Sequence, residues 1–206
     1  QPVDQNGTDL PAVVQELCPD LNIIFSTNKL ESKHLNYLYN IADVTINLAS
    51  NEGFGLGTCE SLMSGTPIIV NVTGGLQDQC GFRLKDKLLT YQDYSEIHSL
   101  HDWRKWEHNE DLTYGEWVKP VWPKSRSLQG SPPTPYIFDD RCDWIEAGER
   151  IREWYDMSKE ERDECGFKGN VIDCSDDAMM SARAVCHLFI DNMNAALENY
   201  EQNERY

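Results

Sequence analysis

Two carboxylates around a glycine-rich turn are the residues of this sequence best suited to chemistry. Glu52 lies just before the turn, and Glu60 lies about one helical turn into the helix expected after it. Between them, Gly53, Gly55 and Gly57 allow the backbone to approach a ligand closely. The first N–H groups of a helix have no partner inside that helix, and with the helix dipole they bind anions without a basic side chain.

The ligand expected at this turn combines phosphates with hydroxyls. A half-buried carboxylate costs free energy unless hydrogen-bond donors meet it, and hydroxyls donate whereas ionised phosphates accept. The helix dipole contributes only about 0.3–1 kcal/mol per charge, so hydrogen bonds from the amides must supply most of the affinity. Phosphates in the middle and hydroxyls at both ends are the features of a nucleoside diphosphate sugar.

Three apolar strands must position this turn. Residues 21–25, 44–49 and 66–72 are short, mostly apolar runs, and the last two flank the turn and its helix. Strands that alternate with amphipathic helices form a parallel sheet with both faces covered. The fold expected is therefore α/β, a Rossmann-like parallel sheet flanked by helices.

The helices between these strands have recognisable ends. A short helix is expected over residues 11–18. Asn28 and Glu31 have the spacing of a capping box and predict the start of a second helix. The helix after the glycine turn runs through Met63 and is expected to stop at Gly65.

The rhythm of strand and helix breaks between about residues 83 and 135. Residues 116–121 predict a further strand, and residues 131–135, which include three Pro, predict an extended loop. Four of the six Trp lie in this aromatic-rich insertion: Trp103, Trp106, Trp117 and Trp122. We expect the insertion to pack over the sheet as additional core. The alternative is a lid or a partner surface, since exposed aromatic residues favour interfaces.

Helical periodicity returns in the last third of the chain, from about residue 143 to residue 203. One apolar stripe is formed by Trp144, Ala147, Ile151, Trp154 and Tyr155. We therefore expect a single domain over residues 1–206, made of the sheet, the insertion and these C-terminal helices.

Composition excludes several classes of function. The formal charge of −17 argues against nucleic acid and against an anionic membrane, because both require a basic surface. No apolar run is long enough to cross a bilayer, and we expect a cytoplasmic protein without a transmembrane segment. The seven Cys include no C-x-x-C pair, a pattern typical of reduced cytosolic thiols. The histidines His98, His101 and His108 are more simply part of a solvated loop than metal ligands.

The glycine turn resembles a family motif. Residues 50–56 read SNEGFGL, Glu60 follows, and residues 64–67 read SGTP. This segment is similar to the E-x(7)-E motif of retaining GT-B glycosyltransferases, especially glycosyltransferase family 4 and its C-terminal donor-binding domain. The lead-in at residues 38–44 and the pair Gly74–Gly75 also match that family.

The resemblance implies a role for each residue of the turn. Glu52 would contact the hydroxyls of the transferred sugar, and Glu60 would bind the ribose diol. The sugar and the distal phosphate would be held by the amides that begin at Gly53 and include Phe54, Gly55, Leu56 and Gly57, with the hydroxyl of Thr58 nearby. The base would lie in the loop around Thr27, Asn28 and Leu30. Such enzymes need no metal or other cofactor, and their leaving diphosphate assists the acceptor on the same face, which gives retention.

Two features of the family are missing from this sequence. Members carry an Arg/Lys pair after the first strand of this half, but no Lys or Arg precedes residues 21–25 here. Acceptor binding in the family belongs to an N-terminal Rossmann-like domain, which is also absent. We therefore expect donor binding to a UDP-, GDP- or ADP-linked sugar by this chain, and transfer to an unknown acceptor only together with that domain.

The glycine turn also allows alternative interpretations. A dinucleotide fingerprint fails on spacing, because its third glycine position holds Thr58 and no acid lies about twenty residues on. A sugar-nucleotide 2-epimerase of the same fold and a non-catalytic sugar-nucleotide-binding module remain open, as does a purely structural turn.

Overall fold

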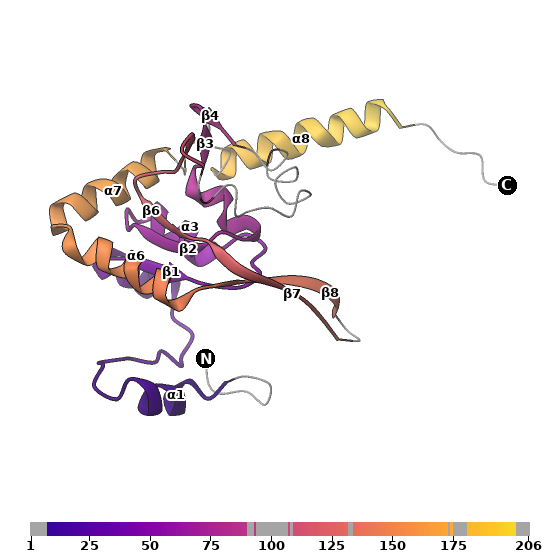
Figure 1. Cartoon of the computed structure of the whole chain (residues 1–206). Helices are drawn as coiled ribbons and strands as arrows, with labels where there is room; N and C mark the ends of the chain where they lie inside the picture. Colours follow the sequence, from indigo (N-terminus) through magenta and orange to yellow (C-terminus); the bar gives the residue numbers. More distant parts are fainter. Residues whose placement is uncertain are drawn as a thin grey trace. The chain divides into compact units, whose positions relative to one another are not determined.

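The computed structural model (Figure 1) describes residues 8–89, 93, 107, 109–131, 134–172, 174 and 181–200. The chain divides into two compact units, Gln1–Tyr37 and Leu38–Tyr206. The first unit contains α1 (Leu10–Leu17), which confirms the helix expected over residues 11–18. Asp9 caps this helix, because its carboxylate accepts from the N–H of Ala12 at 3.1 Å.

Two predictions within the first unit are wrong. Residues 21–25 form no strand: no neighbouring strand among the described residues pairs with them, and Ile24 is 86% exposed. A run of apolar residues becomes a strand only where a neighbour accepts its ladder hydrogen bonds. The helix α2 (Ser32–Ile41) begins later than the capping box implied. The carbonyl of Glu31 accepts the first helical hydrogen bonds, so Asn28 lies about one turn before the start of the helix and does not cap it.

A three-stranded parallel sheet organises the second unit. Its strands are β1 (Thr45–Asn47), β2 (Ile68–Asn71) and β6 (Val118–Val121), in the order β1-β2-β6. β1 and β2 confirm two of the predicted strands, and β6 confirms the strand predicted at residues 116–121. β6 lies inside the expected insertion yet pairs with β2, so this part of the insertion continues the sheet.

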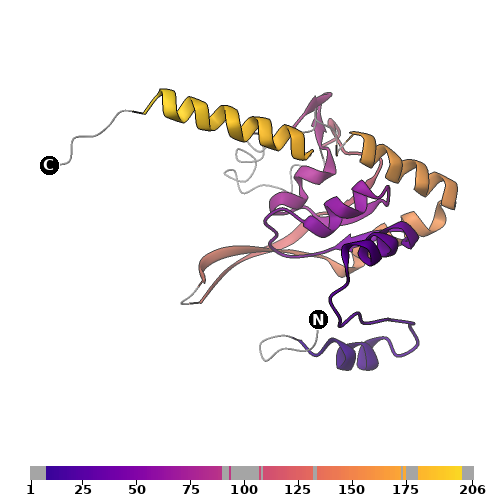
Figure 2. The ribbon, with the colours of Figure 1, turned by 180° about the vertical axis from the view of Figure 1, so that it is seen from behind.

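Helices cover both faces of this sheet. Ile68 and Val70 of β2 pack with Leu62 of α3 (Leu56–Met63) in one core cluster. The intervening Ile69 packs on the opposite face in a second cluster, together with α6 (Trp144–Asp156). The two views in Figures 1 and 2 show α3 and α6 on opposite sides of the sheet. The predicted α/β class, a parallel sheet flanked by helices, is confirmed.

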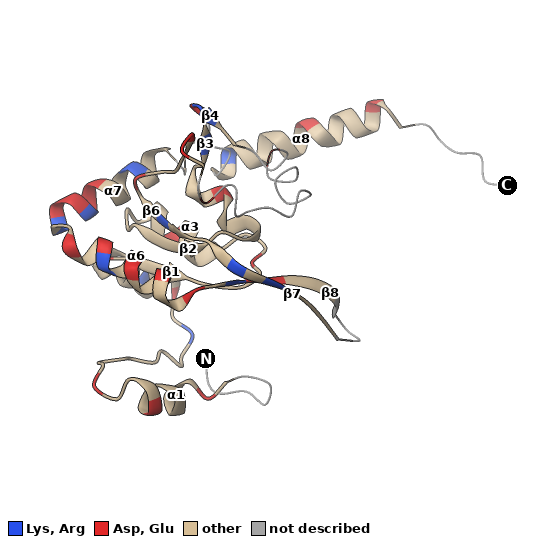
Figure 3. Ribbon diagram, viewed as in Figure 1, with Lys and Arg blue, Asp and Glu red and all other residues tan. Residues whose placement is uncertain are grey.

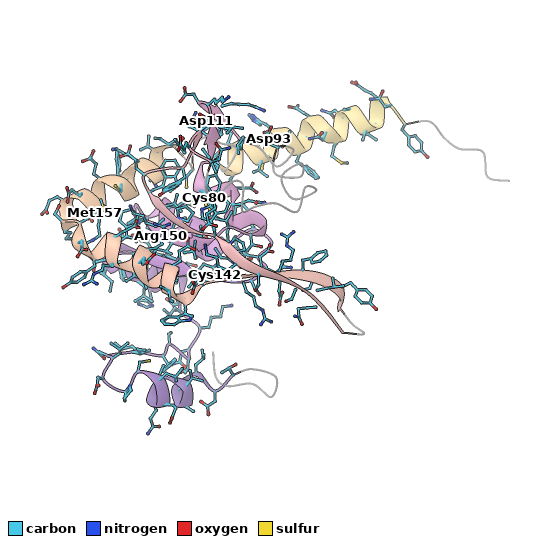
Figure 4. The ribbon with its side chains drawn as sticks, viewed as in Figure 1. Cys80, Asp93, Asp111, Cys142, Arg150 and Met157 are labelled. Atoms are coloured by element: carbon cyan, nitrogen blue, oxygen red, sulfur yellow. The ribbon has the colours of Figure 1, made fainter. Side chains whose placement is uncertain are left out.

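The predicted apolar stripe of α6 is divided between core and solvent. Ala147 and Trp154 are buried against the sheet, whereas Trp144 and Tyr155 are each 81% exposed. Residues 147 and 154 are two turns apart on one side of the helix, and residues 144 and 155 lie on another side. The single stripe was therefore wrong. Arg150, labelled in Figure 4, fastens α6 to the sheet by donating to the carbonyl of Pro120 at 3.1 Å.

Apart from β6, the described strands of the expected insertion pair antiparallel. The two short helical turns and the strands that surround β6 are η1 (Gly74–Leu76), η2 (Asp78–Cys80), β3 (Arg83–Leu84), β4 (Lys87–Leu88), β5 (Leu112–Thr113), β7 (Pro123–Ser131) and β8 (Thr134–Cys142). β7 and β8 pair along a long two-stranded ribbon, visible in Figure 1. The extended loop predicted at residues 131–135 is wrong at both ends, because Ser131 and Thr134 pair within this ribbon.

Two of the four insertion Trp residues belong to the core. Trp117 and Trp122 are buried in the cluster that contains Phe82. Additional core is therefore confirmed for these two, while Trp103 and Trp106 lie outside the described residues.

The remaining helices are α7 (Lys159–Ile172), which contacts α3, and α8 (Ala182–Glu198), which begins after the capping hydroxyl of Ser181. No helix in the described part of the chain has both the length and the apolar character needed to cross a bilayer.

Candidate functional site

The glycine turn ends in a helix whose first amides have no partner within the helix. Gly55 is the N-cap of α3, and intrahelical bonding begins only at the N–H of Cys59, which donates to the carbonyl of Gly55 at 3.0 Å. The amides of Leu56, Gly57 and Thr58 precede that bond. Three such donors at the positive end of a helix dipole are able to bind an anion.

Gly55 must be glycine for two reasons. Its φ of 87° is in the left-handed region, which residues with a Cβ rarely adopt. A Cβ there would also lie 2.5 Å from the side chain of Leu76 and 3.0 Å from the amide nitrogen of Gln79. The turn is thus held tightly against η1 and η2.

The side chain of Gln79 supports the turn through hydrogen bonds to its backbone. This side chain is fully buried, and its Nε2 donates to the carbonyl of Phe54 at 2.7 Å and to that of Gly55 at 3.0 Å. Trp117 in turn donates from Nε1 to the carbonyl of Gln79 at 2.9 Å. Nothing in the sequence singled out Gln79, because the residues it holds lie 24 and 25 positions away.

Glu52 is half-buried and is held through its backbone. The N–H of Gly75 donates to the carbonyl of Glu52 at 3.0 Å. A Cβ on Gly74, which has a φ of 47°, would lie 2.0 Å from that same carbonyl oxygen. The pair Gly74–Gly75 therefore brings the segment after β2 into direct backbone contact with the segment after β1, at the carboxyl ends of neighbouring parallel strands.

Glu60 lies at the surface of α3 and accepts a hydrogen bond from a tyrosine. The hydroxyl of Tyr39 donates to Oε2 of Glu60 at 3.0 Å. Burial raises the pKa of Tyr39 to about 12, and the hydrogen bond to the Glu60 carboxylate and its negative charge add to this. The carbonyl of Tyr39 accepts from the Thr66 hydroxyl at 2.7 Å, so the tyrosine is anchored as well. Tyr39 falls within the lead-in at residues 38–44 and was not predicted as a site residue.

Three further residues of the predicted site have different exposures. Thr58 is fully buried, and its hydroxyl donates to the carbonyl of Gly55 at 2.9 Å, so this hydroxyl holds the turn instead of facing a ligand. Phe54 and Leu56 are exposed, and no atom lies within 4 Å of a Cβ built on Gly53. The outer surface of the turn is therefore open.

The residues predicted to hold the base belong to the other unit. Thr27, Asn28 and Leu30 lie in the unit Gln1–Tyr37, whereas the glycine turn lies in Leu38–Tyr206. Their role in binding a base stays a prediction.

The cations of β6 and β7 are already paired with carboxylates. Figure 3 shows basic positions along these two strands. The ammonium of Lys119 lies 3.3 Å from the carboxylate of Glu153. Lys124 pairs with Glu107 and Glu146. Arg126 pairs with Asp140, and the hydrogen bond to Asp140 raises the pKa of Arg126. These three cations are therefore engaged by carboxylates.

No group of three or more His, Cys, Asp or Glu with the geometry of a metal site occurs within the described residues. The histidines His98, His101 and His108 lie outside that part of the chain.

Similarity to known proteins points to the same segment of the chain. Residues 14–109, a little under half of the chain, match the family model described as "Glycosyl transferases group 1". A D-inositol 3-phosphate glycosyltransferase of Corynebacterium urealyticum is 33% identical over 75 residues, which cover 35% of this chain and 18% of that protein. The chain thus spans only a small part of the length of this relative. Both matches support a transferase of the glycosyltransferase class, and the matched range includes the whole glycine turn.

Proposed function

We propose that the amides at the start of α3 bind the diphosphate of a nucleotide sugar, between Glu52 at the sugar and Glu60 at the ribose. The observation that carries this proposal is the open, amide-lined turn with a carboxylate on each side. Leu56, Gly57 and Thr58 supply N–H donors before the first intrahelical bond. In a chain with a net charge of −17, such local donors are what an anion requires.

The proposed reaction is transfer of the glycosyl group from a UDP-, GDP- or ADP-linked donor to an acceptor, with retention of configuration. Negative charge develops on the diphosphate as it leaves, and fixed amide donors stabilise that charge without reorganising. Glu52 would orient the sugar through its hydroxyls. We propose that the acceptor is bound by a second, Rossmann-like domain, as the resemblance to family 4 of the GT-B enzymes implies, and that no metal is required.

The two carboxylates give the proposal a direct test. Glu60→Ala should weaken binding of the free nucleoside diphosphate by about tenfold, because a hydrogen-bonded carboxylate contributes roughly 1.5 kcal/mol or more. Glu52→Ala should leave that affinity nearly unchanged and instead weaken binding of the sugar-linked form of the same nucleotide. Calorimetric titration of both variants with UDP, GDP and ADP and with their glucose-linked forms measures these effects. Equal losses of nucleoside diphosphate affinity in the two variants would contradict the assigned roles.

A further inference from the structure

An ion pair between buried Asp140 and partly exposed Arg126, outside the predicted site, connects the β7–β8 ribbon to the segment that carries Glu52. Asp140 is only 3% exposed, and its carboxylate pairs with the guanidinium of Arg126 on the facing strand, with Nη2 at 2.9 Å from Oδ2. The same Oδ2 accepts a hydrogen bond from the Thr73 hydroxyl at 2.9 Å. The carboxylate is therefore shared between the ribbon and the segment that follows β2.

The backbone of Asp140 makes two further connections. Its N–H donates to the carbonyl of Ser50 at 2.7 Å. Its carbonyl accepts at 2.6 Å from the side-chain amide of Asn71, which also donates to the carbonyl of Ala49 at 3.0 Å. Asn51 adds a bond from its side chain to the carbonyl of Phe138 at 3.3 Å. Residues 49–51 are thus fastened to β8 immediately before Glu52.

Two segments that hold Glu52, the residues just before it and the residues after β2, are both hydrogen-bonded to Asp140. Ser50 precedes it by two positions and is bonded to the backbone of Asp140. Thr73 immediately precedes the pair Gly74–Gly75, which contacts the carbonyl of Glu52. A change at Asp140 would reach Glu52 through both routes, whereas Gln79 holds the start of α3 through separate bonds.

A structural role alone does not account well for this pair. Burying the Asp140 carboxylate costs free energy that its attraction to the partly exposed Arg126 rarely exceeds by much, so the pair is weak evidence for stability. We propose that Asp140, paired with Arg126, is a positioning residue that sets the orientation of Glu52 toward the donor sugar. This inference rests on the proposed function.

The test is a double-mutant cycle between Asp140 and Glu52. Asp140→Asn should leave the affinity for UDP, GDP or ADP within about twofold, and should weaken the glucose-linked form of the preferred nucleotide by about tenfold, which is about 1.4 kcal/mol. In the Glu52→Ala background the same change should cause no further loss, because a residue that acts through Glu52 has nothing left to position. Calorimetry on the whole chain supplies all four affinities.

A matched control is available one residue away. Asp139 lies on the opposite face of β8, 3.9 Å from Arg141, so Asp139→Asn makes the same chemical change without touching the network, and should change neither affinity. If Asp140→Asn does not fold, Thr73→Val takes its place. That change removes one hydroxyl donor, keeps the ion pair, and should weaken only the sugar-linked ligand, by about threefold.

Different results separate the possible failures. Equal losses of sugar-nucleotide affinity with and without Glu52, or no loss in a folded Asp140→Asn or Thr73→Val protein, would overturn the positioning role while leaving the proposed function intact. Absence of binding by the wild-type chain to all six ligands would instead overturn the proposed function, and this inference with it.

Discussion

At the scale of single residues, the hydrogen bond between Tyr39 and Glu60 is the most specific feature that the structure adds to the site. Tyr39 lies 21 positions before Glu60, and its hydroxyl bonds the carboxylate assigned to the ribose. That hydroxyl also lies 3.5 Å from the position of a Cβ on Gly57, next to the free amides of α3. The tyrosine therefore limits the directions in which the carboxylate can point.

Tyr39→Phe removes this hydroxyl and keeps the ring. We expect affinity for the free nucleoside diphosphate to fall about three- to tenfold, because a single hydrogen bond contributes roughly 0.5–1.5 kcal/mol. Tyr37→Phe is the matched control, since Tyr37 lies on the same helix and is half-exposed. Calorimetric titration of the two variants compares them, and a similar affinity in both would argue against the role of Tyr39.

Asp78 gives a prediction for pH dependence. It lies at the surface in η2, but the protein around its carboxyl raises its pKa to about 6 through desolvation. The folded state therefore favours the protonated acid, and the stability that this contributes is present below about pH 4 and is lost as the pH rises through 6. Asp78→Asn should be more stable than wild type above pH 6 and similar to it at pH 4.

Thermal denaturation of the wild type and Asp78→Asn between pH 4 and pH 8 checks this expectation. A difference in melting temperature that stays constant across this range would show that Asp78 does not titrate as expected.

In the sequence, the residues of the candidate site were easier to recognise than the residues that hold them in place. Glu52, Glu60 and the glycines were recognisable because they lie within one short segment. Gln79 and Asp140 were not, because a buried amide or carboxylate is recognised by its partners, which here lie 24 to 69 positions away along the chain.

At the scale of elements, α7 packs closely against the end of α3. Gly166 of α7 faces Gly65, the residue at which α3 was predicted to stop, and a Cβ on Gly166 would lie 1.9 Å from the carbonyl oxygen of Gly65. Gly169 lies one turn further, against Trp117 and Leu62. The helix approaches closely here because Gly166 and Gly169 have no side chain at the contact.

Gly166→Ala should destabilise the fold by about 1–3 kcal/mol or more, because the atom that would have to move is backbone. Gly148→Ala is the contrasting change: Gly148 lies in the middle of α6 with nothing within 4 Å of its Cβ, so alanine should stabilise the helix by about 0.5–1 kcal/mol. Chemical denaturation of both variants measures the difference. Stabilisation in both would contradict the close approach of α7.

The elements predicted from the sequence are those with a strong local pattern. β1, β2 and α3 follow from apolar runs and glycine punctuation, which need no knowledge of distant residues. β8 escaped prediction because its segment begins in a Pro-rich stretch and becomes a strand only by pairing with β7. Residues 21–25 show the converse, an apolar run without a partner strand among the described residues.

At the scale of the whole molecule, charge decides how an anionic ligand is bound. The chain carries 35 acidic and 18 basic residues, so its long-range potential opposes a diphosphate. The cations of β6 and β7 are engaged by carboxylates. We therefore expect binding to come from short-range donors, chiefly the amides of α3.

The measurement that tests this claim most directly is titration of Gly57→Asp with UDP, GDP, ADP and their glucose-linked forms, beside the wild type. Gly57 is the second residue of α3, where the helix dipole stabilises an acidic side chain. A Cβ at this position makes only ordinary van der Waals contact, so the variant should fold at least as stably as the wild type. Gly148→Asp places the same charge on α6 as a control.

We expect the wild type and Gly148→Asp to bind at least one of these ligands. Gly57→Asp should weaken that binding by at least about tenfold, because a carboxylate would then face the diphosphate. Undiminished binding by a folded Gly57→Asp protein would contradict an anion site at the start of α3.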